Sequence, residues 1–357
     1  MKKAVFYTAN VLFIAAAAVL TGKLLLKNSE LSDLAADLAG ANKLWLALGA
    51  LLAFCFVAGE SVVIKYMLWL FRVKLPFRRC LKYSFIGFFY SCITPSASGG
   101  QPAQLYYMKK DGIGLGHSTL IMLMVTIAYK SVLVIFGLVF YILGHSFVAE
   151  HIGSWSWLLM LGFVLNIAYI TVLMLLFFSP RKMGRIAARL ISLLCRLRIL
   201  KDKKKPAYAK RIDRMVETYS EGSGYIRTHI KAVINIFVVT AVQRMCFFAV
   251  TWAVYRSCGL TGTGFFGIVT IQTMIAVSVE MLPLPGAAGI TEACFIMMFG
   301  GIFTEEYVRA GLLMSRGLTF YMVLLAGAGV TLAAHIITMK KTAPPAAEIK
   351  KDRMKAA

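Results

Sequence analysis

The residues best suited to chemistry are charged side chains inside otherwise apolar runs. An ionised group at the centre of a bilayer costs about 2.5–3.5 kcal/mol on insertion scales, so it marks a transport pathway or a buried ion pair that fixes helix packing. We expect Glu60 to pair with a cation on another helix, either Lys130 or Arg244. Lys65 lies five residues from Glu60, which is poor spacing for a pair on one helix. The predicted intramembrane charge network is Glu60, Lys130, Arg244, Glu280 and Arg316.

A second chemical feature is the stretch 94–110, which reads TPSASGGQPAQLYYMKK. Its prolines and glycines cannot continue a helix, and Pro102 is expected to begin a new one. Gln101 and Gln104 then share one face of that helix, near Tyr107. A helix N-terminus, neutral donors and two following lysines suit a phosphate. The alternative is an ordinary turn between two spans.

A similar break occurs at 282–292, which reads LPLPGAAGITE. A helix is expected to restart near Glu292, where this carboxylate is either a helix-start residue or a group that holds a cationic headgroup or gates a cavity. Together the two breaks offer anion-binding groups from one side and an acidic group from the other. A zwitterionic or aminoacylated phospholipid headgroup needs both, which makes such a lipid the hypothetical substrate.

The composition requires that these features sit in a membrane. The 357 residues are 59% hydrophobic and include several apolar runs of about 20 residues, the length that crosses a bilayer. The net charge is +23, but the basic residues gather between apolar runs, where they report orientation and contact with anionic headgroups. The seven cysteines and five histidines show no metal-ligand spacing, and there is no nucleotide-binding glycine loop. We therefore expect no cofactor, no metal and no nucleic-acid partner.

Lys and Arg in short loops orient the spans. Lys2 and Lys3 place the N-terminus in the cytoplasm, and the basic residues after 338 place the C-terminus there too, in a bacterial-type cell membrane. About six full spans are predicted, at 4–22, 44–71, 117–143, 155–179, 231–258 and 309–338. The connection 180–229 holds fourteen Lys or Arg against four acids and is expected to be cytoplasmic. Its part 184–200 alternates Arg with apolar residues and predicts an amphipathic helix on the anionic leaflet or, alternatively, a solvated basic loop.

This orientation predicts an all-α polytopic fold with an inverted repeat. Segment 83–116 begins and ends on the cytoplasmic side and is too short for two crossings, so it is expected to form a re-entrant hairpin. Segment 259–308 begins and ends outside, and its apolar halves 264–282 and 287–303 form either two short spans or another re-entrant pair. The halves 44–143 and 231–338 then have opposite topology, as in many transporters. The transmembrane domain is predicted to cover 1–338 and a basic tail 339–357.

The two broken stretches, TPSASGGQPAQLYYMKKDG and LPLPGAAGITEA, resemble the transmembrane region of the lysylphosphatidylglycerol synthase/flippase family, the membrane half of the multiple peptide resistance factor. The resemblance covers about 5–338. It implies movement of lysyl-phosphatidylglycerol to the outer leaflet, which repels cationic peptides. One departure is that Ala287 and Ala288 stand where related sequences often have a further glycine. The residues expected to bind the lipid headgroup are Thr94, Ser98, Gly99, Gly100, Gln101, Gln104, Tyr107, Pro285, Gly286, Gly289 and Glu292, of which Ser98 and Gln104 come from the residue types alone.

The sequence is compatible with three functions. The first is a lipid flippase. The second is the phosphatidylglycerol lysyltransferase that the family name implies, but the chain ends about 20 residues after the last predicted span, so we do not expect it to catalyse that transfer alone. The third is a membrane subunit that docks a separate aminoacyl-lipid synthase through 180–229. Membrane phospholipids are the expected partners in each case, and a homo-oligomer is a further prediction.

Overall fold

A computed structural model describes residues 38–196 and 229–340, with single residues and short pieces between 206 and 224. Within these ranges the chain is helical and contains no strand. Four single helices and one kinked segment among the described residues are long and apolar enough to cross a membrane. The all-α, polytopic prediction is confirmed, while the predicted span 4–22 and nearly all of the basic tail lie outside the described residues.

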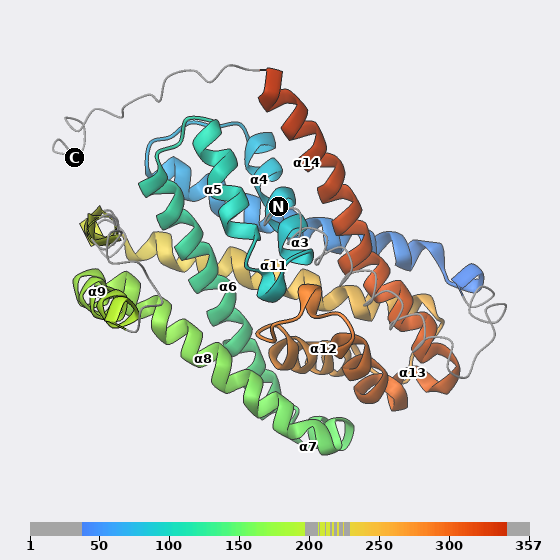
Figure 1. Cartoon of the computed structure of the whole chain (residues 1–357). Coiled ribbons are helices and arrows are strands. Elements are labelled where there is room, and N and C mark those ends of the chain that lie inside the picture. Colours follow the sequence, from blue (N-terminus) through green and yellow to red (C-terminus); the bar gives the residue numbers. More distant parts are fainter. Residues whose placement is uncertain are drawn as a thin grey trace.

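The first half of the described chain holds two long helices with a helical hairpin between them (Figure 1). The long helices are α3 (Lys43–Leu70) and α6 (Leu115–Leu143). The hairpin consists of α4 (Phe77–Cys92), the 3₁₀ turn η1 (Pro95–Ala97) and α5 (Gly100–Lys110). At 1.5 Å per residue, α4 and α5 are about 24 and 17 Å long, which is shorter than the roughly 30 Å hydrocarbon core. Because α5 folds back on α4, the hairpin has the shape that the sequence predicts for this segment.

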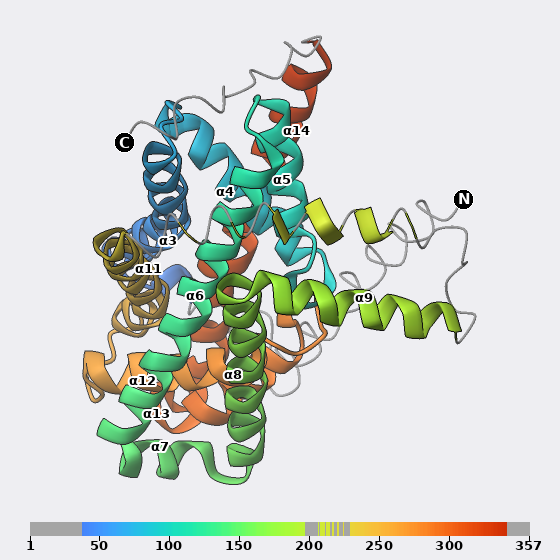
Figure 2. The ribbon, with the colours of Figure 1, turned by 90° about the vertical axis from the view of Figure 1, so that its left-hand side faces the viewer.

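The middle of the chain forms one more long helix of the bundle and then a helix that projects from it. The short helices α7 (His145–Ile152) and η2 (Gly153–Trp155) join α6 to α8 (Ser156–Phe178). Helix α9 (Pro180–Arg196) follows after one residue and projects sideways from the bundle (Figure 2). Basic side chains lie on one face of α9 and apolar ones on the other, as its sequence predicts.

The second half repeats this element order. It begins with α11 (Ile230–Ser257), followed by α12 (Phe265–Val279), the 3₁₀ turn η4 (Pro285–Ala287) and α13 (Ile290–Arg316). Thr304, with φ 62°, breaks α13, so the predicted boundary between 287–303 and the last span falls at a real kink. A π-helical turn, η5 (Gly317–Tyr321), then joins α13 to α14 (Met322–Lys340).

Corresponding elements of the two halves also pack in corresponding ways. Helices α3 and α11 are both 28 residues long and lie against each other, and each break begins 52 to 55 residues after the start of its half. Helix α4 packs on α14, and its counterpart α12 packs on α6. The turns η1 and η4 are in contact. The two hairpins therefore meet tip to tip.

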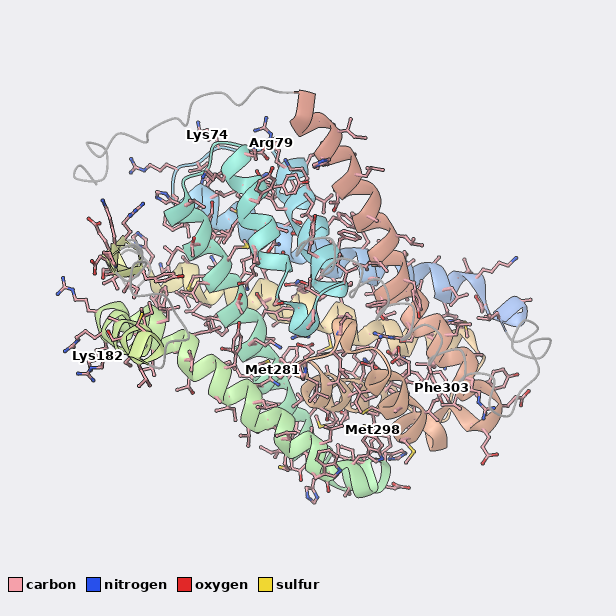
Figure 3. All side chains as sticks on the ribbon, in the orientation of Figure 1. Lys74, Arg79, Lys182, Met281, Met298 and Phe303 are labelled. Carbon is pink, nitrogen blue, oxygen red and sulfur yellow. The ribbon has the colours of Figure 1, made fainter. Side chains whose placement is uncertain are left out.

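The hairpins open toward opposite margins of the molecule. Figure 3 places Lys74 and Arg79, at the open end of the first hairpin, at one margin. Met281, at the break of the second hairpin, lies near the centre, and Met298 and Phe303 lie toward the opposite side. This arrangement supports the inverted repeat, which stays a prediction with respect to the two faces of a membrane.

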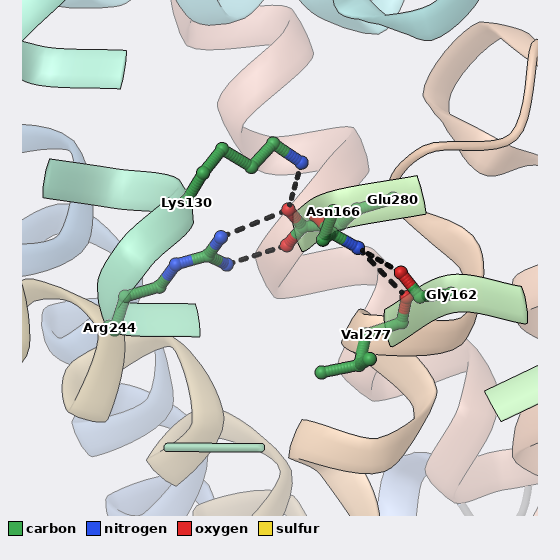
Figure 4. Close-up of polar contacts among 6 residues, drawn as sticks. All are labelled: Lys130, Gly162, Asn166, Arg244, Val277 and Glu280. Carbon is green, nitrogen blue, oxygen red and sulfur yellow. Dashed lines mark hydrogen bonds and ion pairs between the residues drawn. The ribbon is translucent and has the colours of Figure 1, made fainter. Parts of the chain in front are cut away.

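Close contact between α8 and α12 anchors the second hairpin. A Cβ on Gly162 would lie 2.3 Å from the Val277 carbonyl oxygen, so only glycine allows this approach. Val277 is in the last turn of α12, where carbonyls lack helical partners. Asn166 Nδ2 donates to the Gly162 oxygen at 2.8 Å and to the Val277 oxygen at 3.3 Å, tying the two helices together (Figure 4).

We predict that Gly162→Ala destabilises the protein, because the new methyl group collides with backbone rather than with a movable side chain. Overpacking of this kind costs about 1–3 kcal/mol. The apparent melting temperature in detergent, measured by size-exclusion after heating, is expected to fall by several degrees. The control is Gly300→Ala in α13, where no atom lies within 4 Å of the added Cβ. An equal effect of both substitutions would contradict this account.

Candidate functional site

A cavity of about 620 Å³ lies where the two hairpin tips meet. It is lined from the first half by α3, α4, η1, α5 and α6, and from the second half by α11, α12, η4 and α13. Its wall contains four ionisable members of the predicted charge network, namely Glu60, Lys130, Glu280 and Arg316. The breaks are therefore parts of one chamber, whose mostly apolar wall contains a few charged and polar side chains.

Glu280 is the centre of the charge network. Arg244 binds both of its carboxylate oxygens, through Nη1 at 2.6 Å and Nη2 at 2.9 Å, and Lys130 Nζ lies 3.0 Å from Oε2 (Figure 4). The guanidinium of Arg244 is fully buried and stacks on Tyr129, 3.5 Å from the ring centroid. This bidentate geometry with an additional cation is the arrangement in which a buried ion pair is well compensated. It joins α6 and α11 to the break after α12.

The predicted pairing of Glu60 with Lys130 or Arg244 is wrong. Both cations bind Glu280, and Glu60 instead accepts a hydrogen bond from Gln104 Nε2 of α5 at 2.5 Å. Gly87 makes this contact possible, since a Cβ there would lie 2.3 Å from Gln104 Nε2. Among the described residues, no basic side chain forms an ion pair with Glu60.

Glu292 fastens the second break. Its Oε2 accepts the Gly289 N–H at 2.6 Å, and its Oε1 accepts Arg316 Nε at 2.7 Å. Arg316 Nη2 also donates to the Gly286 oxygen at 3.2 Å. Only 1% of the Glu292 side chain is exposed. The structure therefore gives Glu292 the helix-start role, and the cavity meets its partner Arg316 instead.

The first break is fastened by hydroxyl and amide groups. Thr94 Oγ1 accepts the Gly99 N–H at 2.8 Å and donates to the Tyr90 oxygen at 2.6 Å. Gln101, where the helix restarts, donates to Thr126 Oγ1 on α6. In the second half, Glu292, in the first turn of α13, and Arg316, beyond the kink in the same helix, correspond to Gln101 and Thr126. The restarting helix is thus tied to the following span by neutral groups in the first hairpin and by an ion pair in the second.

Both breaks use a left-handed residue at the same place. Ala97 has φ 53° and Ala287 has φ 50°, a region that favours glycine. Ala287, one of the two alanines that stand where related sequences often have a glycine, thus lies at a position where glycine would be less strained. At Gly286, with φ 58°, an added Cβ would also lie 2.3 Å from the Phe320 ring.

The predicted headgroup residues divide into two groups. Ser98, Gln101, Gln104 and Gly286 line the cavity. The others are not part of its wall and support the breaks from behind or nearby; they are Thr94, Gly99, Gly100, Tyr107, Pro285, Gly289 and Glu292.

Several wall residues were missed by the sequence reasoning. Thr126 and Tyr129 lie on the same face of α6 as Lys130, at helical spacing that points to them. Gln272 is a polar residue in the middle of apolar α12 and accepts from Thr251 at 3.0 Å. The aromatic wall residues Phe88 and Phe247 carry no sequence signal that separates them from ordinary apolar residues.

The formal charges around the cavity are separated. Lys130 and Arg244 share one carboxylate, so the Glu280 cluster carries a surplus of one positive charge. Arg316 and Glu292 cancel. Glu60 forms no ion pair within the described part of the chain, so its formal negative charge is not balanced there. The described residues contain no group of three His, Cys, Asp or Glu placed to hold a metal ion. The chamber is thus suited to a small ligand that carries both signs of charge.

Comparison with known proteins agrees with this architecture. Residues 8–327 match the family described as the lysylphosphatidylglycerol synthase TM region. A search of curated proteins found no match. The match covers most of the chain, including both hairpins and every charged residue of the cavity. The chain therefore belongs to the lysylphosphatidylglycerol synthase transmembrane-region family.

Proposed function

We propose that this protein translocates phospholipids of the phosphatidylglycerol type, including lysyl-phosphatidylglycerol, between the leaflets of a cell membrane. The observation that carries this proposal is the cavity at the junction of two oppositely opening hairpins, with the positively charged Glu280 cluster in one part of its wall. Broken helices near the midplane form the substrate sites of many transporters. The volume of about 620 Å³ is within the range of small-ligand sites, enough for a headgroup while the acyl chains stay in lipid.

The wall of the cavity supplies what a phosphodiester needs. Lys130 is the more accessible cation of the Glu280 cluster, with 11% of its side chain exposed against 0% for Arg244. Gln101, Ser98 and Arg316 add donors from the two breaks. Charge-assisted donors bind phosphate oxygens more strongly than neutral ones. We assign the phosphate to this part of the wall.

The proposed direction is toward the outer leaflet. The basic margin marked by Lys74, Arg79 and Lys182 is assigned to the cytoplasm by the positive-inside rule (Figure 3). Delivery of a cationic lipid to the opposite leaflet would reduce the negative charge of the outer surface and so weaken the binding of cationic antimicrobial peptides. Both termini then lie in the cytoplasm.

Lys130→Gln is expected to slow translocation of acyl-labelled phosphatidylglycerol at least tenfold in proteoliposomes. The substitution removes the accessible cation but leaves the two Arg244–Glu280 bonds, so the fold is expected to persist. The measurement is dithionite quenching of outer-leaflet fluorescent lipid. Lys74→Gln, on the exposed loop after α3, is the matched control.

Two results would contradict the proposal. One is wild-type protein that moves no phosphatidylglycerol-type lipid faster than empty liposomes. The other is a new ninhydrin-staining cationic lipid when the chain is expressed in a host that lacks aminoacylated phosphatidylglycerol, which would favour the lysyltransferase instead.

We further propose that α9 lies on the anionic leaflet surface. Five basic residues and no acids occur in its 17 residues, and Ile186 and Leu193 are about half exposed (46% and 50%). Exposed apolar side chains beside a basic face are typical of interfacial helices. A separate synthase docked on this helix is the alternative occupant.

Arg185→Gln with Arg189→Gln is expected to lift α9 from anionic membranes, because each basic residue near the surface contributes about 1 kcal/mol. A spin label at Leu193 would report the depth in nanodiscs with and without anionic lipid. The control pair is Lys74→Gln, in the loop before α4, with Arg79→Gln, in the first turn of α4. A label depth that is insensitive to both lipid charge and the α9 substitutions would refute surface binding.

A further inference from the structure

The Glu60 carboxylate differs from the carboxylates of Glu280 and Glu292 in its partners. Glu280 has two cations, and Glu292 has Arg316 and a backbone N–H. Among the described residues, Glu60 has only neutral hydrogen-bond partners, the amide of Gln104 and the hydroxyl of Ser84, and it forms no ion pair. It nevertheless lines the same cavity. A carboxylate in a partly buried site is stable when a cation compensates it, so a ligand cation is the natural complement.

The surroundings of Glu60 select the kind of cation. Phe56 lies one helical turn before Glu60 on α3 and packs against Phe88, Tyr129 and Phe247, with ring centroids 4.9, 6.4 and 4.8 Å away. Phe88, Tyr129 and Phe247 all line the cavity together with Glu60. Arg244 covers one face of Tyr129, and the rings of Phe88 and Phe247 in the same wall as Glu60 favour an organic ammonium group. A divalent metal ion would need six or more oxygen ligands, which this wall of rings does not offer.

The two lysines nearest in sequence or in the cavity wall, Lys65 and Lys130, have other partners. Lys130 is bound to Glu280, and Lys65, five residues along α3, has its Nζ 5.8 Å from the Phe77 ring centroid. The amide of Gln104 has one role here, which is to hold the carboxylate toward the chamber from the α5 side. Gly87 lets Gln104 take that position.

We propose that Glu60 is the residue that recognises the ammonium group of an aminoacylated or zwitterionic phospholipid, while Lys130 and Arg316 face its phosphate. This inference rests on the proposed lipid translocation and deepens it. It makes Glu60 a specificity-determining residue, since a headgroup with phosphate alone leaves this carboxylate uncompensated. The carboxylate that binds the cationic headgroup is then Glu60 on α3, and not Glu292, which the sequence had suggested for this role.

The test compares two acyl-labelled lipids, lysyl-phosphatidylglycerol and phosphatidylglycerol, in proteoliposomes of wild type and Glu60→Gln. Glutamine keeps the shape and can still accept the Gln104 hydrogen bond, so only the charge is lost. Loss of one charged contact predicts a fall of about tenfold or more for the lysyl lipid. Translocation of phosphatidylglycerol should be unchanged or faster. Glu60→Asp should restore part of the preference, and Glu150→Gln on the exposed α7 is the matched acid-to-amide control.

Two outcomes overturn the inference without touching the proposed function. They are an unchanged rate for the lysyl lipid in Glu60→Gln, and an equal fall for both lipids. If wild type moves neither lipid, the proposed function fails, and binding then decides the inference. The lysyl lipid should raise the melting temperature of purified wild type more than phosphatidylglycerol does, and Glu60→Gln should abolish that difference. No Glu60-dependent difference would overturn the assignment.

Discussion

The structure depends on how charges are neutralised inside apolar helices. Glu280 stands at the break after α12, and its two cations come from α6 and α11, so one carboxylate joins three elements from both halves. Removing Glu280 would leave two buried cations without compensation, which is far more costly than losing a neutral contact. The stacking of Arg244 on Tyr129 fixes the guanidinium further. The hairpin tips are therefore held at one place, and the cavity between them is a consequence of that constraint.

The two halves share a backbone plan but differ in chemistry. Each has a proline that starts a 3₁₀ turn, an alanine with positive φ two residues later and a helix that restarts within five residues. In the first half the restarting helix is tied to the next span by Gln101 and Thr126, and in the second by Glu292 and Arg316. Glu280 and Arg244 have no charged counterparts in the first half, and Glu60 has none in the second. An inverted backbone thus carries an asymmetric charge distribution, and this asymmetry gives the chamber a positive and a negative part.

The sequence predicted the helices well because apolar length and breaks are local properties. The spans at 44–71 and 117–143 agree with α3 and α6 to within a few residues, and the kink at Thr304 separates the two segments that hydropathy had divided. Partners of charged residues were harder, because they depend on which helices adjoin across more than 100 residues of chain. Of the five residues expected to form one network, Lys130, Arg244 and Glu280 are linked, whereas Arg316 pairs with Glu292 and Glu60 bonds with Gln104. Phe88 and Phe247 could not be found at all, since an apolar residue facing a cavity has the same local pattern as one facing lipid.

Under the proposed function, a chamber with separated charges gives a headgroup a route across the membrane. The main barrier to lipid exchange is moving a charged headgroup out of water. A phosphate that meets Lys130 and Arg316, and an ammonium that meets Glu60, keep compensating charges at the midplane, so the barrier falls for a lipid that carries both. A lipid with phosphate alone leaves Glu60 uncompensated and crosses with a higher barrier. Under the proposed function, selectivity and passage are then the same physical effect.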